Sequence, residues 1–380
     1  MLDYDGKYVE ESAVISKGHI IEKSDDTEPE YYVGARCVSD LSKIEARNET
    51  VVYLGYIYNH WGHFLVDFSS RLWFAKDNTA QNYKYVFIVN ENERFEPIKP
   101  IKDFLECLNL SDIEYINKPT KFEKVIIPVQ SYITNMYYSQ KHLNLFDYVA
   151  EKAMESCDQT NYPDKVYFTR ISYKKAERTE VGEQLLCKTL ADNGFRIVSP
   201  EQCSLFEQIR YIRNAAIVAG IAGTIPHNML FAKEKQTLWI FNKTYIINMM
   251  QMDINSMKHL NATYVDCYAC CQARPLGGGP FLITKTNQLM KFCKAHNINI
   301  NYPDSMLKKE IKDYLDLISV SKEYHPQVIK NMKSVHYFNP EFAQRFFDDY
   351  LSIMYKPSVF FLMKNRAISI LRLVKQRVLK

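Results

Sequence analysis

The chain is organised around Tyr58-Asn59-His60-Trp61-Gly62-His63-Phe64-Leu65-Val66-Asp67-Phe68-Ser69-Ser70-Arg71-Leu72-Trp73. Read as one helix that begins near Gly62, this stretch places His63, Asp67 and Arg71 one turn apart on a single face. It also supplies an apolar surface that would anchor the helix against a core, made of Phe64, Leu65, Phe68, Leu72 and Trp73. An imidazole, a carboxylate and a guanidinium on one face can move a proton beside an anionic substrate. The same spacing also fits a solvated face with an Asp67–Arg71 ion pair. A second group of residues is therefore needed to distinguish a catalytic face from a solvated one.

Length and composition limit the class of protein. A chain of 380 residues is long enough for two domains and an extension, which we place at 1–155, 156–300 and 301–380. The hydrophobic content of 47% and the charged content of 24% are ordinary for a globular protein. The formal net charge of +4 is too small over this length to indicate a nucleic-acid partner, so none is expected.

Cysteines and the first residues bear on the compartment. The nine cysteines have no paired spacing, and the cluster Cys267, Cys270 and Cys271 has no neighbouring histidine, so we expect no metal site there. The chain opens with Met1-Leu2-Asp3-Tyr4-Asp5, which has neither a basic nor an apolar leader region. With no run of about twenty apolar residues, the sequence favours a cytoplasmic protein with reduced thiols.

Short apolar strands alternate with helical patterns along most of the chain. In the first part, strands are expected at 51–56, 84–89, 113–116 and 124–128. A helix at 140–160 leads to a second series, with strands at 166–170, 195–198, 215–220 and 237–241. This alternation is typical of parallel sheets with helices on their faces. We therefore predict an α/β protein with two Rossmann-like domains that face a cleft.

The second group of residues lies in Ala219-Gly220-Ile221-Ala222-Gly223-Thr224-Ile225-Pro226-His227-Asn228-Met229-Leu230-Phe231. Thr224 can cap a helix that has Pro226 in its first turn. The free amide groups of that helix start, at the carboxyl end of a parallel strand, would suit a diphosphate. Glycines that only turn the chain are equally compatible with the pattern. The stretch is neither a Walker loop nor a dinucleotide-binding fingerprint.

Two arginines form a third element. Arg170 ends a predicted strand and therefore points toward the edge where parallel sheets bind ligands. A guanidinium there can hold a phosphate through two hydrogen bonds and offset the charge of a leaving group. Arg178 follows in the next loop, and for each arginine a plain surface position is the alternative.

In this order and spacing, the motifs resemble glycosyltransferase family 61 over about residues 50–245. The residues that carry the resemblance are His63-Phe64-Leu65-Val66-Asp67 with Arg71-Leu72, Tyr167-Phe168-Thr169-Arg170, Arg178, Gly194 to Glu201, Ser204 to Ile209, and Ile217 to Phe231. Two departures concern the donor contacts. Ala222 stands where the family often has His before the second glycine, and Gly182-Glu183 stands for Asn-Glu. His227 could compensate for the missing imidazole.

The resemblance implies a GT-B-like fold, a donor held in the C-terminal domain and inverting transfer from a nucleotide sugar, commonly UDP-linked. Asp67 is then the first choice of base, with His63 either orienting it or acting as the base. The residues expected to bind the donor are Arg170, Arg178, Gly223, Thr224, His227 and Asn228, and those expected to bind the acceptor or support the site are Arg71 and His60. We expect no cofactor and no metal, because cationic side chains would replace a divalent ion at the diphosphate.

The C-terminal part is expected to be a helical extension. Its tail, 358–380, has apolar residues at helical spacing and six cations without an acid, namely Lys364, Arg366, Arg372, Lys375, Arg377 and Lys380. A basic amphipathic helix lies well on an anionic membrane, which would place the protein on the inner face of the cytoplasmic membrane near a lipid-linked glycan. A packing helix or a contact in a homo-oligomer fits the same pattern.

Three functions stay open on the sequence. The first is an inverting glycosyltransferase of bacterial surface polysaccharide, capsular polysaccharide or lipopolysaccharide, that uses a cytoplasmic nucleotide sugar. The second is a non-catalytic nucleotide- or glycan-binding protein of the same fold, which the Ala222 departure would permit. The third is a GT-B transferase of a polyol phosphate. Turnover separates the first two, and the donor that is consumed separates the third.

Overall fold

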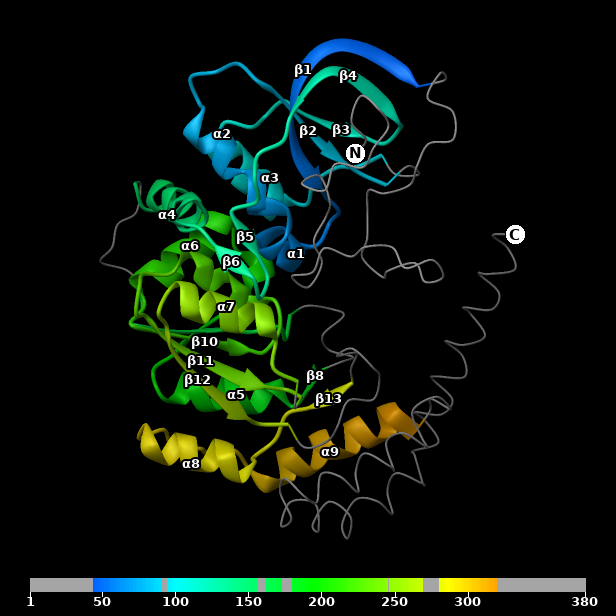
Figure 1. Cartoon of the computed structure of the whole chain (residues 1–380). Coiled ribbons are helices and arrows are strands. Elements are labelled where there is room, and N and C mark those ends of the chain that lie inside the picture. Colours follow the sequence, from blue (N-terminus) through cyan, green and yellow to red (C-terminus); the bar gives the residue numbers. More distant parts are fainter. Residues whose placement is uncertain are drawn as a thin grey trace.

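The computed structural model describes residues 44–90, 94–155, 162–172, 180–244, 246–268 and 280–319. Within these ranges the chain forms two parallel sheets with helices packed on them, which confirms the predicted α/β class (Figure 1). Arg178 and the tail at 358–380 lie outside the described residues.

The first sheet has four parallel strands in the order β3-β2-β1-β4. Its strands are β1 (Glu45–Tyr56), β2 (Lys84–Ile88), β3 (Ile113–Ile116) and β4 (Thr120–Ile126). The four predicted strands of the first part are confirmed, but β1 begins at Glu45 rather than at Val51. The added residues pair with the start of β4, where Glu45 lies opposite Thr120.

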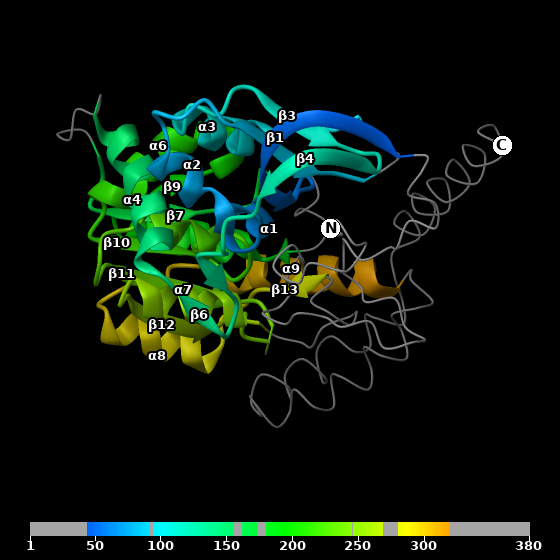
Figure 2. The same cartoon turned by 45° about the horizontal axis from the view of Figure 1, so that its top comes forward.

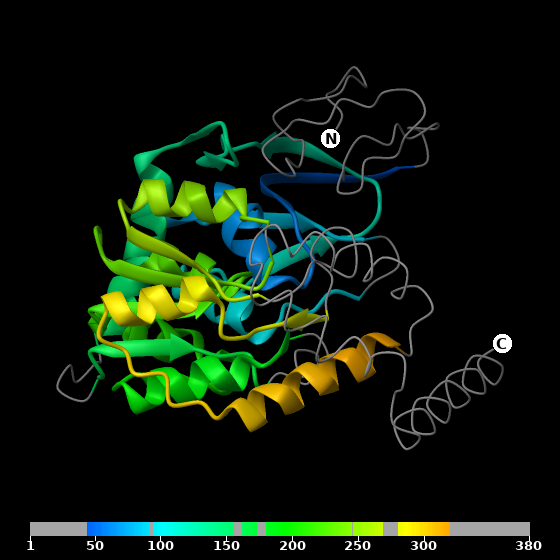
Figure 3. The same ribbon diagram turned by 90° about the horizontal axis from the view of Figure 1, so that it is seen from below.

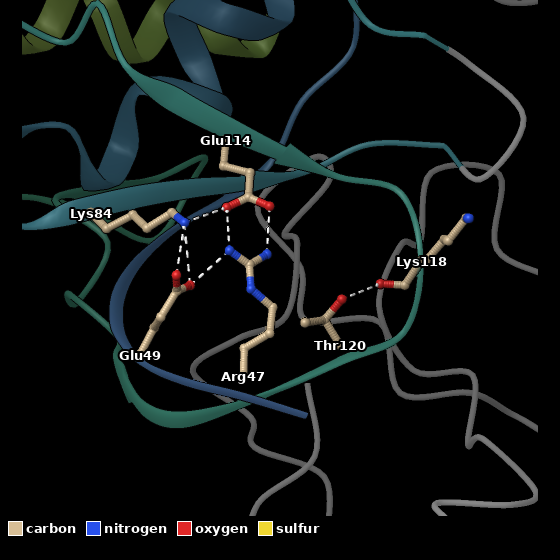
Figure 4. A network of polar contacts seen from close by, with 6 residues as sticks. All are labelled: Arg47, Glu49, Lys84, Glu114, Lys118 and Thr120. Carbon is tan, nitrogen blue, oxygen red and sulfur yellow. Dashed lines mark hydrogen bonds and ion pairs between the residues drawn. The ribbon is translucent and has the colours of Figure 1, made fainter. Parts of the chain in front are cut away.

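Side chains of the first sheet alternate between two faces. One face carries Val52 and Phe87 into the main hydrophobic core, whereas Val51 and Val86 pack on the other side. At the outer end of the sheet, four charged side chains tie β1, β2 and β3 together (Figure 4). Arg47 donates two hydrogen bonds to Glu114, at 2.5 and 2.9 Å, and Lys84 lies between Glu114 and Glu49. A bidentate arginine in a network of charges orders the side chains more than an isolated surface ion pair does.

The second sheet has five parallel strands in the order β12-β11-β10-β7-β9. Its strands are β7 (Lys165–Phe168), β9 (Arg196–Val198), β10 (Ile217–Ile221), β11 (Thr237–Asn242) and β12 (Asn261–Asp266). Each of the predicted strands in this part is confirmed. Because β10 lies between β7 and β11, the loops that follow these three strands meet at one edge of the sheet.

Helices cover both faces of the second sheet. Val218, Leu238 and Ile240 point into the core shared with α4 (Gln140–Met154), α6 (Leu205–Asn214) and α7 (Met249–Met257). Their neighbours Ala219 and Trp239 point the other way, toward α5 (Glu183–Asp192) and α8 (Asn287–Ala295). Seen from below, α8 and α9 (Asp304–Ser319) lie on that second side (Figure 3). The result is a three-layer unit.

The two sheets share one hydrophobic core. Four buried phenylalanine rings meet there, from four elements: Phe64 of α1 (Trp61–Val66), Phe104 of α3 (Lys99–Cys107), Phe146 of α4, and Phe231 of the 3-10 helix η7 (Ile225–Phe231). Ring centroids lie 5.2 Å apart between Phe64 and Phe104, and 5.2 Å apart between Phe146 and Phe231. This contact of the four rings places α1 between the first sheet and the second half of the chain (Figure 1 and Figure 2).

Smaller elements complete the described fold. The two-stranded hairpin of β5 (Tyr132–Ile133) and β6 (Tyr137–Tyr138) contacts α7, because Asp253 accepts hydrogen bonds from Tyr132 and from the backbone of Asn135, both at 2.8 Å. β8 (Glu180–Val181) pairs with β13 (Phe281–Leu282) beside the second sheet. Across the described ranges, no helix combines the length and apolarity needed to cross a bilayer.

Two predicted helices are wrong in detail. The stretch after Gly62 is not one helix: α1 ends at Val66, and the 3-10 helix η3 (Phe68–Arg71) and α2 (Trp73–Asp77) follow. The helix after Thr224 is the seven-residue 3-10 helix η7, and the Thr224 side chain makes no capping hydrogen bond. The free amide groups at the start of this segment are therefore those of a short 3-10 helix, and the expected anion site there stays a prediction.

Buried His142 should make folding sensitive to acid. Its ring is fully buried and contacts the Ser131 hydroxyl at 3.1 Å, and burial, with the charge of Lys258, lowers its pKa to about 3. An unfolded histidine takes up a proton below about pH 6.5, so falling pH favours the unfolded chain. The loss should reach about 3 kcal/mol at pH 4.

Between pH 6.5 and pH 4, we expect the free energy of unfolding of His142→Asn to decrease less than that of the wild type. Urea unfolding at several pH values measures both slopes. Parallel slopes would contradict a neutral, buried His142.

Candidate functional site

The first part of the candidate site is the His63–Asp67 pair. His63 Nδ1 lies 2.7 Å from Asp67 Oδ2, so the predicted spacing of four residues does bring the two side chains together. Asp67 ends α1, and its backbone amide donates to the His63 carbonyl at 2.7 Å. The carboxylate side chain is 7% exposed and the imidazole 22% exposed. Burial raises the pKa of Asp67, while the hydrogen bond from His63 opposes that rise.

His60 supports the start of α1. Its ring accepts a hydrogen bond from the backbone amide of His63 at 3.2 Å, which caps the helix. The rings of His60 and His63 lie 4.6 Å apart, and Tyr58 packs beside His63 at 5.5 Å. Burial and the neighbouring His63 lower the pKa of His60. His60 therefore helps to position His63 by capping the start of α1, and it is a supporting residue of the site.

Arg71 does not lie with His63 and Asp67 on a common helical face. The break after Val66 turns it into the fold, where the residue is 2% exposed. Its Nε donates to the Pro128 carbonyl at 3.0 Å, and its guanidinium lies 5.5 Å from the centre of the Tyr53 ring. These contacts tie η3 to β1 and to the strand connection after β4.

The second part of the site is the turn that follows β10. Gly223 has a φ of +144°, a backbone conformation that side chains disfavour, so the residue is glycine for a backbone reason. Pro226 lies in the first turn of η7, as the sequence predicts. The turn is at the carboxyl end of the central strand of the sheet, where ligands of parallel α/β sheets bind.

The two parts touch each other directly. A Cβ atom placed on Gly62 would lie 2.9 Å from Oγ1 and 3.0 Å from Cγ2 of Thr224, so only a glycine allows this approach. One residue earlier, Trp61 Nε1 donates a hydrogen bond to Asn228 Oδ1 at 2.8 Å. Residues next to His63 thus contact residues next to Gly223. Asn228, expected to bind the donor, uses its side-chain oxygen to join the two halves.

His227 is buried behind the turn in a chain of amide side chains. Its Nδ1 lies 2.8 Å from Gln251 Oε1, and its Nε2 lies 3.4 Å from Asn248 Nδ2. Asn248 Oδ1 already accepts from the Met250 amide, so its Nδ2 is the donor to His227, and the proton of the ring is on Nδ1. Burial lowers the pKa of His227 to about 4, so the ring is neutral near pH 7. It is 4% exposed, which makes it a supporting residue in this conformation.

Arg170 lies across the turn with two residues that the sequence analysis did not single out. Its Nε is 3.4 Å from Glu180 Oε2, and Glu180 also pairs with Lys243. Glu180 is 1% exposed at the side chain, so a buried carboxylate holds both cations. The next acid, Glu183, accepts from Thr169 Oγ1 at 2.9 Å and from the Arg170 amide at 3.0 Å.

The structure therefore groups most of the predicted residues. His63 lies on α1, and His60 and Asp67 flank its two ends. The turn that carries Gly223 and Thr224 lies against α1, with Arg170 on the far side. Lys243 directly follows β11, so the rule that sites lie at strand ends was the signal that could have identified it. Among the described residues, no three side chains of His, Cys, Asp or Glu are arranged to hold a metal ion.

Parallel α/β sheets with polar residues gathered at strand ends define a broad class of enzymes and ligand-binding proteins. The comparison with protein families narrows this class, because residues 61–239 match the family Glycosyltransferase 61. This match confirms the resemblance to glycosyltransferase family 61 that the sequence motifs predict. The matched region contains both parts of the candidate site, from Trp61 to Trp239. A comparison with curated proteins finds no match.

The contact between Gly62 and Thr224 can be tested by a double-mutant cycle. Gly62→Ala adds a Cβ that meets both branches of the Thr224 side chain, and overpacking of this kind typically costs about 1–3 kcal/mol. Thr224→Ala removes both branches, so the double variant should recover most of the loss. Urea unfolding of the four proteins measures the coupling. Additive effects of the two substitutions would contradict the contact.

Proposed function

We propose that this protein is an inverting glycosyltransferase that moves a sugar from a nucleoside diphosphate, UDP in the first place, to a glycan of bacterial surface polysaccharide. In this proposal the two parallel sheets are the two domains of a GT-B-like enzyme. The second sheet binds the donor, and the first sheet with α1 supplies the residues that activate the acceptor.

One observation carries the proposal. The His63–Asp67 pair lies beside the turn at Gly223, because Gly62 contacts Thr224 and Trp61 binds Asn228. A proton acceptor and a set of groups for a departing diphosphate are what inverting transfer requires at one place. The match of residues 61–239 to glycosyltransferase family 61 supports the same chemistry.

In the proposed reaction, the acceptor hydroxyl oxygen attacks the anomeric carbon of the sugar while the bond from that carbon to the diphosphate oxygen breaks. The hydroxyl proton goes to the His63–Asp67 pair, and the diphosphate leaves with the bonding electrons. Asp67 is more buried than His63 and binds its Nδ1. This geometry favours His63 Nε2 as the atom that takes the proton, with Asp67 orienting the ring and stabilising its charged form.

The groups proposed for the diphosphate lie at the carboxyl ends of β7 and β10. Arg170 supplies a guanidinium beside Gly223, and the backbone at Gly223 and Thr224 borders the same space. Arg178 is a further candidate from the sequence, but its position lies outside the described residues. Positive charge near the bridging oxygen lowers the barrier to its departure.

The transfer step can be tested at the acid of the pair. Asp67→Asn keeps the shape of the side chain but removes the charge that stabilises a protonated His63. We expect a decrease in kcat of at least about a hundredfold, with donor binding nearly unchanged. Release of nucleoside diphosphate in the presence of acceptor measures kcat, and calorimetry measures donor binding.

A companion experiment separates the two candidate bases. His63→Gly makes room for imidazole, and added imidazole should restore part of its activity but none of the activity of Asp67→Asn. If imidazole has no effect on His63→Gly and Asp67→Gly is rescued by formate, Asp67 is the base. Full activity in both variants without additives would exclude the pair from the reaction.

We also propose that transfer does not need a divalent ion, because cationic side chains neutralise the diphosphate. EDTA should then leave the rate within about twofold of the untreated enzyme, since no metal-held charge is lost. The measurement is turnover before and after chelation, with manganese added back as the control. Loss of activity with EDTA and recovery with manganese would reject metal independence.

A further inference from the structure

Three neighbouring strands end beside one another in the second sheet, and each is followed by a residue of one cluster. Arg170 follows β7, Gly223 follows β10 and Lys243 follows β11. A Cβ atom placed on Gly223 would lie 3.8 Å from Arg170 Nη1 and 3.8 Å from Lys243 Nζ. Two cations from the loops after the flanking strands therefore converge over the backbone turn of the central strand.

Lys243 is held firmly in this position. Its side chain is 12% exposed, it pairs with Glu180, and its Nζ lies 4.6 Å from the centre of the Phe281 ring. A buried ammonium needs such partners, because removing a charge from water is costly. The Lys243 pKa is lowered, first by burial and then by the repulsion of Arg170, while Glu180 opposes the decrease.

Glu180 is shared by the two cations of the cluster. Glu180 carries one negative charge and lies within ion-pair distance of two cations, with Arg170 Nε at 3.4 Å from Oε2 and Lys243 on Oε1. The more exposed of these cations is Arg170, whose side chain is 27% exposed. The two cations lie next to Gly223 at the ligand-binding edge of the sheet, while a second buried acid, Glu183, binds the Thr169 hydroxyl and the Arg170 amide.

We propose that Lys243 binds the diphosphate of the donor together with Arg170, above the Gly223 turn, and that Glu180 holds the two cations in place. This inference rests on the proposed function and adds to it a residue that contacts the leaving group. An arginine can present two parallel hydrogen bonds to one phosphate, whereas a lysine places a compact charge on the next. Lack of a side chain at Gly223 lets an anion approach both.

A purely structural role for Lys243 predicts a different result. If the lysine only satisfies Glu180, its removal decreases stability but leaves ligand binding unchanged. Binding of probes with and without phosphate therefore separates the two roles. Suitable probes are UDP, ADP, CDP and GDP, inorganic pyrophosphate, and the free nucleoside of the diphosphate that binds.

The experiment uses the full chain and isothermal calorimetry. The wild type is titrated first, and if it binds none of the four nucleoside diphosphates, the proposed function fails before the inference is tested. For Lys243→Met, we expect at least about tenfold weaker binding of the nucleoside diphosphate and of pyrophosphate, which is the loss of one charge-assisted contact. Binding of the free nucleoside should not change. Lys243→Arg should retain most of the affinity.

Lys258→Met is the matched control. Lys258 is also a buried lysine with a carboxylate partner, Asp147 at 2.9 Å, but it faces α4 rather than the Gly223 turn. The Lys258→Met variant should be less stable than the wild type but should bind diphosphate with the same affinity. If Lys243→Met does not fold, Lys243→Met with Glu180→Gln removes both charges of the buried pair and should also bind pyrophosphate at least about tenfold more weakly. Wild-type affinity in either variant would overturn the inference.

Discussion

The contact of four phenylalanine rings fixes how the two halves of the described fold meet. Phe64 and Phe104 belong to the half that contains the first sheet, Phe231 belongs to the second half, and Phe146 lies on α4, which packs against the second half. Each ring is fully buried, and aromatic pairs at these separations contribute about 0.5–1.5 kcal/mol beyond the burial of their area. The two halves are therefore joined by core packing at this point. Because α1 carries Phe64, the same packing holds His63 and Asp67 against the turn after β10.

The same electrostatic arrangement occurs on both sides of the contact between the two halves. In each case a nearly buried carboxylate lies behind a more exposed basic group: Asp67 behind His63, and Glu180 behind Arg170 and Lys243. Buried carboxylates without partners would be costly, so each acid is paired with a basic group whose position it fixes. Such pairs supply oriented charge at little cost when a ligand arrives, because the side chains are already ordered.

Local sequence rules predicted most of the elements. The strands of both sheets follow from apolar runs. Ser204 and Glu207, three residues apart at the start of α6, form a capping box, with the Glu207 amide donating to Ser204 Oγ at 3.2 Å. The His63–Asp67 contact follows from its spacing of four residues and survives even though α1 ends at Val66. These features depend on neighbours in sequence, which is why the sequence alone was enough.

Features that depend on distant residues could not be predicted in this way. The helix was expected to continue through Ser69 and Ser70, but the Ser70 carbonyl accepts hydrogen bonds from the amide and hydroxyl of Ser131, at 2.7 and 2.8 Å. Ser69 Oγ donates to the Leu65 carbonyl at 3.0 Å, which also competes with the helical pattern. The break turns Arg71 away from His63. Nothing in the sequence near Ser70 indicates that Ser131 will bind its carbonyl.

The same reasoning explains why residues of one predicted group have different roles. Asn228 and His227 follow the Gly223 turn in sequence, but Trp61 takes the Asn228 oxygen, and Gln251 and Asn248 enclose His227. Both side chains are therefore committed to holding the turn against α1 and α7. Lys243 is remote in sequence from Gly223 yet reaches its turn, because β11 is the neighbour of β10 in the sheet. In a parallel sheet, strand order thus decides which cations meet at a site, and strand order is fixed by packing over the whole chain.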